Sequence, residues 1–192
     1  MHTQTKSVYF YTLFLLSLIL ALLMSSSAWA AQTVHIILEI DGNRIEGEST
    51  IQSMDREGTI EAYSAGLSVI TPRDSGTGQQ TGARLYRPFT VLKPVDKSTP
   101  HLFQALAQNR PVTRLEARYY RPDRTGAGSE EHYYTVLMEN GYVSSIVQTS
   151  ETGLASGIAN AAPATELVSF GFQRITFIYE IGGVEFQDDL SR

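Results

Sequence analysis

The chain has 192 residues, a formal charge of −5 at neutral pH and a pI near 5.4. Hydrophobic residues make up 42% and charged residues 18%, a composition that predicts a folded domain with one core and excludes a disordered tail or a coiled coil. The negative charge argues against a nucleic-acid partner, and the absence of cysteine excludes disulfides, thiol nucleophiles and cysteine-based metal sites.

The first thirty residues have the features of a secretory signal peptide. A polar start containing Lys6 is followed by an almost wholly apolar run over 8–24, and residues 28–30 read A-W-A. A signal peptidase requires small residues at the first and third of these positions, Ala28 and Ala30, so we expect cleavage between Ala30 and Ala31. An uncleaved anchor is the alternative, although the apolar run is at the short end of the roughly 20 residues that span a bilayer.

The expected organisation is therefore a signal peptide over residues 1–30 and one folded domain over 31–192. The mature protein is expected to be exported, to a periplasm or outside the cell, without a stable membrane anchor. A lipid anchor is not expected, because it would require a cysteine after the apolar run.

The first part of the mature chain is predicted to be extended. Residues 33–40 read T-V-H-I-I-L-E-I, and this alternation predicts a half-buried strand. Residues 41–43 (D-G-N) should turn the chain into a short, partly exposed strand over 44–49. Residues 60–70 predict a strand pair or one bulged strand, with the irregularity at Gly66.

A long polar loop and the clearest helix follow. Residues 71–84 contain three glycines and no apolar period, which predicts an exposed loop. Residues 87–95 are expected to be extended, because their prolines suit strand ends or a sheet edge. A helix of about ten residues should be capped by Ser98 or Thr99 and should end before Pro111.

Further strands are predicted after the helix. Residues 112–120 and 131–138 alternate in the manner of strands. Asn140 and Gly141 form the dipeptide typical of a hairpin turn, which predicts a separate strand over 142–149.

The C-terminal part of the chain is less uniform. Residues 151–165 are compatible with a loose helix or a loop. Residues 167–181 predict a closing strand or a bent strand pair, with the bend at Gly171. Roughly seven to nine strands and one helix predict a mainly β fold, an antiparallel β-barrel with one flanking α-helix.

The sequence contains no clear constellation for catalysis or metal binding. His35, His101 and His132 each lack a second ligand at metal-binding spacing, and no G-x-S-x-G motif occurs. The loop with Gly76 and Gly78 leads into a strand-like segment, whereas phosphate-binding loops lead into a helix. We therefore expect no enzymatic activity, no metal and no cofactor.

Paired acidic and paired aromatic residues are further candidates for a functional role. The acidic pairs are Glu46 with Glu48, Glu130 with Glu131, and Asp188 with Asp189. General acid–base catalysis is one interpretation of such pairs, but solvated edges or tails are the simpler one. Tyr119-Tyr120 and Tyr133-Tyr134 could form a ligand surface, but strand alternation sends one ring of each pair inward and favours core packing.

Five segments, in order along the chain, carry a resemblance to one known family. Residues 36–49 read I-I-L-E-I-D-G-N-R-I-E-G-E-S, similar to the family's opening strand and G-E-S turn, and residues 58–66 are similar to its next segment. The most specific segment is 89–102, F-T-V-L-K-P-V-D-K-S-T-P-H-L, which is close to the family's strand, D-K-S-[ST]-P motif and helix. Residues 133–146 and 166–179 complete the order. The chain thus resembles the Hcp proteins, the ring-forming tube subunits of bacterial type VI secretion systems.

The resemblance implies a mainly β barrel with one flanking helix, a hexameric ring that can stack head to tail, and no catalytic residues. Expected partners are further copies of the chain, and other secretion-system components or effector cargo held in the ring lumen. The signal peptide departs from the family, whose members leave the cytoplasm through their own machine. A second hypothesis is therefore an exported periplasmic or extracellular binding module that forms no tube and binds its ligand with residues 71–84 or a tyrosine face.

Overall fold

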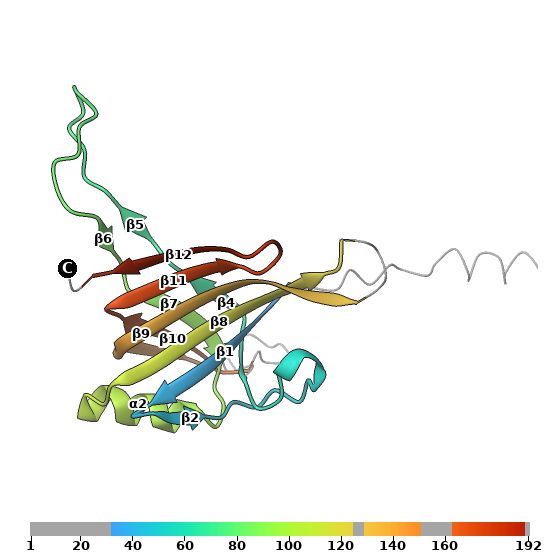
Figure 1. The fold of residues 1–192 in the computed structure, drawn as a ribbon. Helices are drawn as coiled ribbons and strands as arrows, with labels where there is room; N and C mark the ends of the chain where they lie inside the picture. Colours follow the sequence, from blue (N-terminus) through green and yellow to red (C-terminus); the bar gives the residue numbers. More distant parts are fainter. Residues whose placement is uncertain (1–31, 125–128, 151–162, 191–192) are drawn as a thin grey trace, which may run out of the picture. The chain divides into compact units, whose positions relative to one another are not determined.

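Antiparallel strands dominate the fold, as a computed structural model of the chain shows (Figure 1). The structure describes residues 32–124, 129–150 and 163–190. The strands are β1 (Thr33–Ile40), β2 (Asn43–Ile45), β3 (Ile60–Ala62), β4 (Ser64–Gly66), β5 (Val69–Ile70), β6 (Leu85–Tyr86), β7 (Phe89–Pro94), β8 (Val112–Pro122), β9 (Glu130–Thr149), β10 (Thr165–Gly171), β11 (Arg174–Tyr179) and β12 (Val184–Asp189). The α-helix, α2, is Thr99–Gln108, and a short 3-10 turn covers Ser53–Asp55.

The strand pairings form a circuit that returns to its first strand. β1 pairs with β8, β8 with β9, β9 with β10, and β10 with β7. β7 pairs with β4, and β3, which is separated from β4 by Tyr63 alone, pairs back to β1. The Tyr63 amide donates to the Leu92 carbonyl, so this segment stays hydrogen-bonded while it passes from one neighbour to the other. The 60–66 segment therefore links the two ends of the strand order, because β3 pairs with β1 and β4 pairs with β7.

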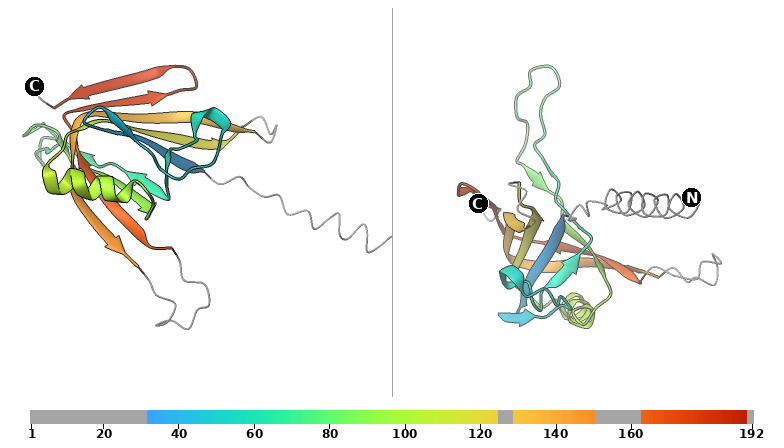
Figure 2. Two further views of the ribbon diagram at one scale, coloured as in Figure 1. Left: turned by 90° about the horizontal axis from the view of Figure 1, so that it is seen from below. Right: turned by 90° about the vertical axis from the view of Figure 1, so that its right-hand side faces the viewer.

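One face of the long strands packs into a shared core. Ile36, Leu38, Leu115 and Ile175 are at most 2% exposed, and they occupy alternating positions on β1, β8 and β11. The helix contributes Leu102 to the same core and packs against β9 (Figure 2). The predicted mainly β, antiparallel fold with one flanking helix is therefore confirmed.

The predicted hairpin turn at Asn140-Gly141 is wrong, because β9 continues through it. Residues 134–139 of β9 pair with β11, and residues 142–149 pair with β10. The edge of β9 that faces away from β8 is therefore hydrogen-bonded over most of its length. Asn140 has a positive φ of 53°, and a Cβ at Gly141 would lie 2.4 Å from the Gly171 carbonyl oxygen. The dipeptide therefore bends one long strand where its partner changes.

Other boundaries also differ from the sequence-based expectation. The change of partner in the 60–70 segment occurs at Tyr63 and not at Gly66. β12 is not among the predicted elements. The predicted cleavage position between Ala30 and Ala31, and residues 151–162, lie outside the described residues. Within the described ranges, no helix has both the length and the apolar character needed to cross a bilayer.

Candidate functional site

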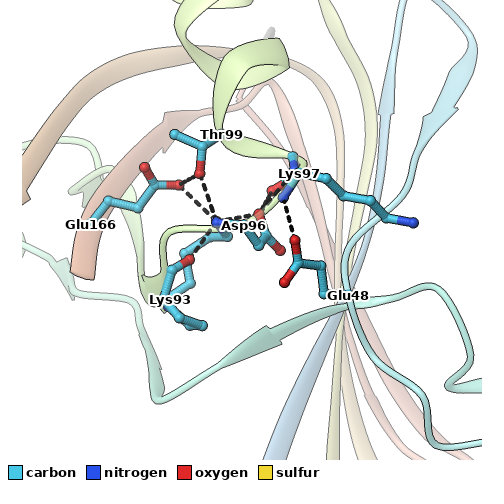
Figure 3. A network of polar contacts seen from close by, with 8 residues as sticks. Glu48, Lys93, Asp96, Lys97, Thr99 and Glu166 are labelled. Carbon is cyan, nitrogen blue, oxygen red and sulfur yellow. Dashed lines mark hydrogen bonds and ion pairs between the residues drawn. The ribbon is translucent and has the colours of Figure 1, made fainter. Parts of the chain in front are cut away.

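The D-K-S-T-P segment that begins at Asp96 builds a buried ionic network where β7 leads into α2 (Figure 3). Lys93 Nζ lies 2.8 Å from Asp96 Oδ1 and 2.7 Å from Glu166 Oε1. Glu166 faces Lys93 across the β10–β7 register, and the Thr99 hydroxyl donates to the same Glu166 oxygen at 2.9 Å. The side chains of Lys93 and Glu166 are 2% and 0% exposed, so each charge depends on the other for compensation.

Asp96 takes the capping role that we predicted for Ser98 or Thr99. Its Oδ1 accepts hydrogen bonds from the Ser98 amide at 2.9 Å and the Ser98 hydroxyl at 2.5 Å. Ser98 precedes the helix but makes no side-chain capping bond to it. Pro100 lies in the first turn, where its missing N–H needs no partner. One carboxylate thus caps the helix and pairs with Lys93.

The E-G-E-S segment that begins at Glu46 lies against the same helix start. Glu48 Oε1 accepts from the Lys97 amide at 3.2 Å, and Lys97 Nζ lies 3.0 Å from Glu46 Oε2. A Cβ at Gly47 would lie 2.3 Å from the Thr59 carbonyl oxygen, so only glycine fits this close backbone approach. The glutamates are exposed, as expected for a solvated edge, and they also tie this segment to the helix.

A second buried cation, Arg56, packs on the outer side of the sheet. Its Nη2 lies 2.6 Å from Glu130 Oε2, and its guanidinium carbon lies 4.6 Å from the Tyr120 ring centre. His35 Nδ1 lies 2.8 Å from Thr59 Oγ1, and burial, assisted by the positive charge of Arg56, lowers the pKa of His35. Glu130 therefore belongs to a partly buried ion pair, and the solvated-edge interpretation is wrong for it.

The three histidines do not converge. His35 is buried in β1, and His101 is exposed on α2. His132 lies in β9, where its ring stacks on Tyr120 at 5.0 Å between ring centres and burial lowers its pKa. Among the described residues, no three His, Cys, Asp or Glu side chains form a group that could hold a metal ion.

The tyrosine pairs divide between the interior and the surface. Tyr120 is 1% exposed, which agrees with the packing interpretation. Tyr119 meets Tyr134 at 5.4 Å and Tyr133 at 6.5 Å between ring centres, and the Arg121 guanidinium lies 4.5 Å from the centre of the Tyr133 ring. Burial raises the pKa of Tyr119 to about 12. These three rings form a half-buried aromatic cluster at the end of the sheet.

The predicted loop 71–84 is the outer part of a two-stranded ribbon made by β5 and β6, which we call the arm (residues 69–86). Val69 pairs with Tyr86, and Ile70 pairs with Leu85. Ile70 and Leu85 are 51% and 55% exposed. Figures 1 and 2 show the arm projecting away from the body of the domain. The arm therefore presents apolar side chains to its surroundings.

Asp188 of β12 connects the arm to the body. The Arg84 guanidinium contacts both Asp188 carboxylate oxygens, and the Tyr86 hydroxyl donates to one of them at 2.9 Å. The Asp188 side chain is 8% exposed, and Arg84, followed by Tyr86, holds the pKa of this carboxyl below its usual range. The expectation that Asp188 lies in a solvated tail is therefore wrong.

The core-facing side of β11 and β12 continues past the core to an exposed edge. Ile175 is buried, whereas Phe177 on the same face of β11 stacks on Phe186 at 6.3 Å between ring centres. Phe186 is 59% exposed and Val184 is 66% exposed. Within the described part of the chain, this face remains open, and we call it the β12 face.

Comparison with known proteins gives consistent matches. The family model described as "Type VI secretion system effector, Hcp" matches residues 37–179. The "Major exported protein" of Pseudomonas aeruginosa is 34% identical over 121 residues, which cover 63% of this chain and 69% of that protein. The structure of Hcp1 from the E. coli EAEC 042 pathovar matches with a TM-score of 0.70 and 27% identity, and the match covers 83% of this chain and 99% of that one.

A more distant structure agrees on the fold. The secreted protein Hcp3 from Pseudomonas aeruginosa matches with a TM-score of 0.64 at 22% identity, over 83% of this chain and 98% of that one. The family match extends from β1 to the end of β11 and includes the Lys93 network. The resemblance predicted from the sequence is confirmed: the chain belongs to the Hcp family of type VI secretion proteins, which are secreted, structural tube subunits and not enzymes.

Proposed function

We propose that this protein is exported through a cleaved signal peptide and assembles with further copies of itself into a hexameric ring. The observation that carries the proposal is that the described chain leaves two apolar surfaces open, the arm and the β12 face. Family membership supports the ring, and the sequence of residues 1–30 supports the route of export.

The physical argument for assembly starts from the side chains on these surfaces. Ile70, Leu85, Val184 and Phe186 are each more than half exposed. Removing apolar surface from water contributes about 25 cal/mol per Å². A two-stranded ribbon is also marginally stable by itself, and a free strand edge favours pairing with another chain. Contact between copies would supply both the arm and the edge with a partner.

The arm and the β12 face differ in shape and in residues, which favours a ring over a two-fold dimer. A contact that joins unlike surfaces is head-to-tail, and head-to-tail contacts produce a closed ring when the rotation between copies closes. The family's secreted tube subunits are consistent with such an arrangement.

The route of export is tested by the mass of the exported protein. The whole chain, with a C-terminal affinity tag, is produced in a Gram-negative bacterium and isolated from the periplasm and the medium. We expect an intact mass that corresponds to a first residue of Ala31. Ala30→Phe should accumulate uncut protein, because a large side chain is excluded before the cleavage position. Ala21→Leu, inside the apolar run, is the matched control, and a full-length mass in the unsubstituted protein contradicts the proposal.

The ring is tested by light scattering of the exported protein across a range of concentrations. We expect a mass of six copies that dilution changes little. Leu85→Asp on the arm and Phe186→Asp on the β12 face should each lower this mass, because a charge would be buried at the contact. Met54→Asp, at a half-exposed apolar residue elsewhere, is the control. A monomer at high concentration would contradict the ring and favour an exported binding module.

A further inference from the structure

We infer that Asp188 is a positioning residue that sets the direction in which the arm leaves the body. The arm is continuous with the body only at its two ends, where the Arg87 amide donates to the Ser68 carbonyl at 2.8 Å. Two chain ends and one backbone hydrogen bond leave a ribbon free to pivot. A further constraint is needed if the arm is to hold one orientation.

The side chains at the base of the arm supply that constraint. In the described part of the chain, the side-chain hydrogen bonds that the arm makes outside itself end on Asp188 and Asp189. Arg84 reaches both Asp188 oxygens, and its Nη2 also donates to the Asp189 carbonyl at 3.4 Å. The Tyr86 ring meets Phe172 edge-on at 5.7 Å between ring centres.

Asp188 is suited to this role because it lies in β12, a strand of the body that pairs with β11. It faces Ile175 in the β11–β12 register, and its side chain is 8% exposed, whereas the Arg84 side chain is 44% exposed. The carboxylate therefore belongs to the paired strands of the body, and its more exposed partner belongs to the arm. A two-pronged contact between a guanidinium and a carboxylate fixes orientation as well as distance. The Tyr86 hydroxyl adds a third bond from a different strand residue.

The consequence for assembly rests on the proposed function. With Asp188 in place, the arm presents Ile70 and Leu85 in one direction to the next copy. Without it, each copy would first have to restrict a mobile arm, and the entropy lost on ordering would weaken the contact. Asp188 would thus act on the contact between copies without being part of it.

The experiment measures the orientation of the arm directly. Because the chain contains no cysteine, Ser75→Cys in the arm and Gln108→Cys at the end of α2 provide two unique positions for spin labels. Pulsed electron paramagnetic resonance then gives the distribution of distances between the labels. The labelled protein is mixed with an excess of unlabelled protein, so that the distances measured lie within one copy.

We expect a single narrow distance population in the otherwise unchanged protein. Asp188→Asn and Arg84→Met should each convert this population into a broad or multiple distribution of distances. Arg84→Lys keeps the positive charge but cannot contact both carboxylate oxygens in the same way, so it should give a distribution of intermediate width. Glu185→Gln, on the same strand, is the matched control and should leave the distribution unchanged. Arg84→Met alters a partly exposed arm residue, so it separates loss of the contact from any folding defect of an Asp188 variant.

The outcomes distinguish the positioning role from the ring. A narrow distribution in both Asp188→Asn and Arg84→Met, or a broad one in the unchanged protein, overturns the inference. Light scattering of the same proteins tests whether the orientation of the arm affects assembly. A broad distance distribution in a variant that still has the mass of the full ring overturns that effect. The third outcome is a monomeric protein whose label-to-label distance distribution is narrow and becomes broad in the variants. This outcome supports the positioning role and contradicts the ring.

Discussion

Lys93 Nζ lies 2.7 Å from Glu166 Oε1, and this contact joins β7 to β10 beside the start of α2. The second carboxylate oxygen of Glu166 is buried without a hydrogen-bond partner among the described residues. The buried charges of Lys93 and Glu166 are therefore compensated by each other and by contacts with Asp96 and Thr99. The family's D-K-S-T-P motif thus has a structural basis, since it positions the helix by compensating a buried lysine.

Removing the Lys93 charge should destabilise the fold strongly. Lys93→Met leaves Glu166 and Asp96 without their cation, and breaking a buried ion pair from one side costs about 3–5 kcal/mol. Urea unfolding at a fixed protein concentration measures this loss in the free energy of unfolding. Lys97→Met is the control, because Lys97 and Glu46 are 50% and 69% exposed and an exposed ion pair contributes little to stability. Equal losses in the two variants would contradict the role assigned to the buried network.

The capping role of Asp96 predicts different effects for two neighbouring residues. Asp96→Ala removes the acceptor for the Ser98 amide together with one partner of Lys93, so it should cost more than the roughly 1–2 kcal/mol of an ordinary cap. Ser98→Ala removes a hydroxyl that makes no capping bond and should cost clearly less. Thermal unfolding followed by circular dichroism gives the comparison. A larger loss of stability in Ser98→Ala than in Asp96→Ala would show that Ser98, and not Asp96, is the cap.

Gly47 should tolerate no side chain. A Cβ there would lie 2.3 Å from the Thr59 carbonyl oxygen and 2.4 Å from Ile60 Cα, and backbone atoms cannot move away as a flexible side chain can. Gly47→Ala should therefore lower the free energy of unfolding by about 1–3 kcal/mol. Gly82→Ala is the control, because its nearest neighbour would be Pro72 Cγ at 3.6 Å, an ordinary contact. Chemical unfolding of both variants tests the prediction, which fails if the two are equally stable.

Acidification should destabilise the protein through His35. Its pKa is lowered from 6.5 by burial and by Arg56, so the unfolded chain binds this proton more readily than the folded one. The free energy of unfolding therefore has its full value above about pH 6.5 and falls as the pH drops towards the lower pKa of the folded state. His35→Gln, which keeps a hydrogen-bond donor for Thr59, should reduce this slope.

The control for this pH dependence is a substitution that leaves every histidine in place. Gln108→Ala at the exposed end of α2 should leave the slope of unfolding free energy against pH unchanged, because it removes no ionisable side chain. His132 adds to the slope, since burial also lowers its pKa, so His35→Gln should remove only part of it. Urea unfolding at several values between about pH 8 and pH 5 gives the slopes. An unchanged slope in His35→Gln would contradict the assignment.

Much of the fold follows from patterns within a few residues. The alternation over 33–40 predicts β1 with its observed bounds, and Pro100 and the following residues predict α2 to within a residue. These predictions succeed because period-two alternation and helix-start chemistry are local properties. The D-K-S-T-P segment also identifies the family, although its letters do not show that Asp96 is the cap.

The failures concern contacts between distant parts of the chain. Asn140-Gly141 is a favourable turn in isolation, but β10 and β11 pair along β9 on both sides of it and hold it within one strand. Asp188 looks like part of a solvated tail until β12 brings it to Arg84, 104 positions away in the sequence. No local pattern encodes such a pairing, because its energy comes from two segments that meet only in the folded chain.

The sequence alone therefore determined the class of fold, the family and the absence of cysteine chemistry, and it predicts the signal peptide. The tertiary structure decided which charges are buried, where β9 bends and how Asp188 holds the arm. The reason is physical: backbone preference and amphipathic period act over neighbouring residues, whereas burial and ion pairing depend on which distant segments come together.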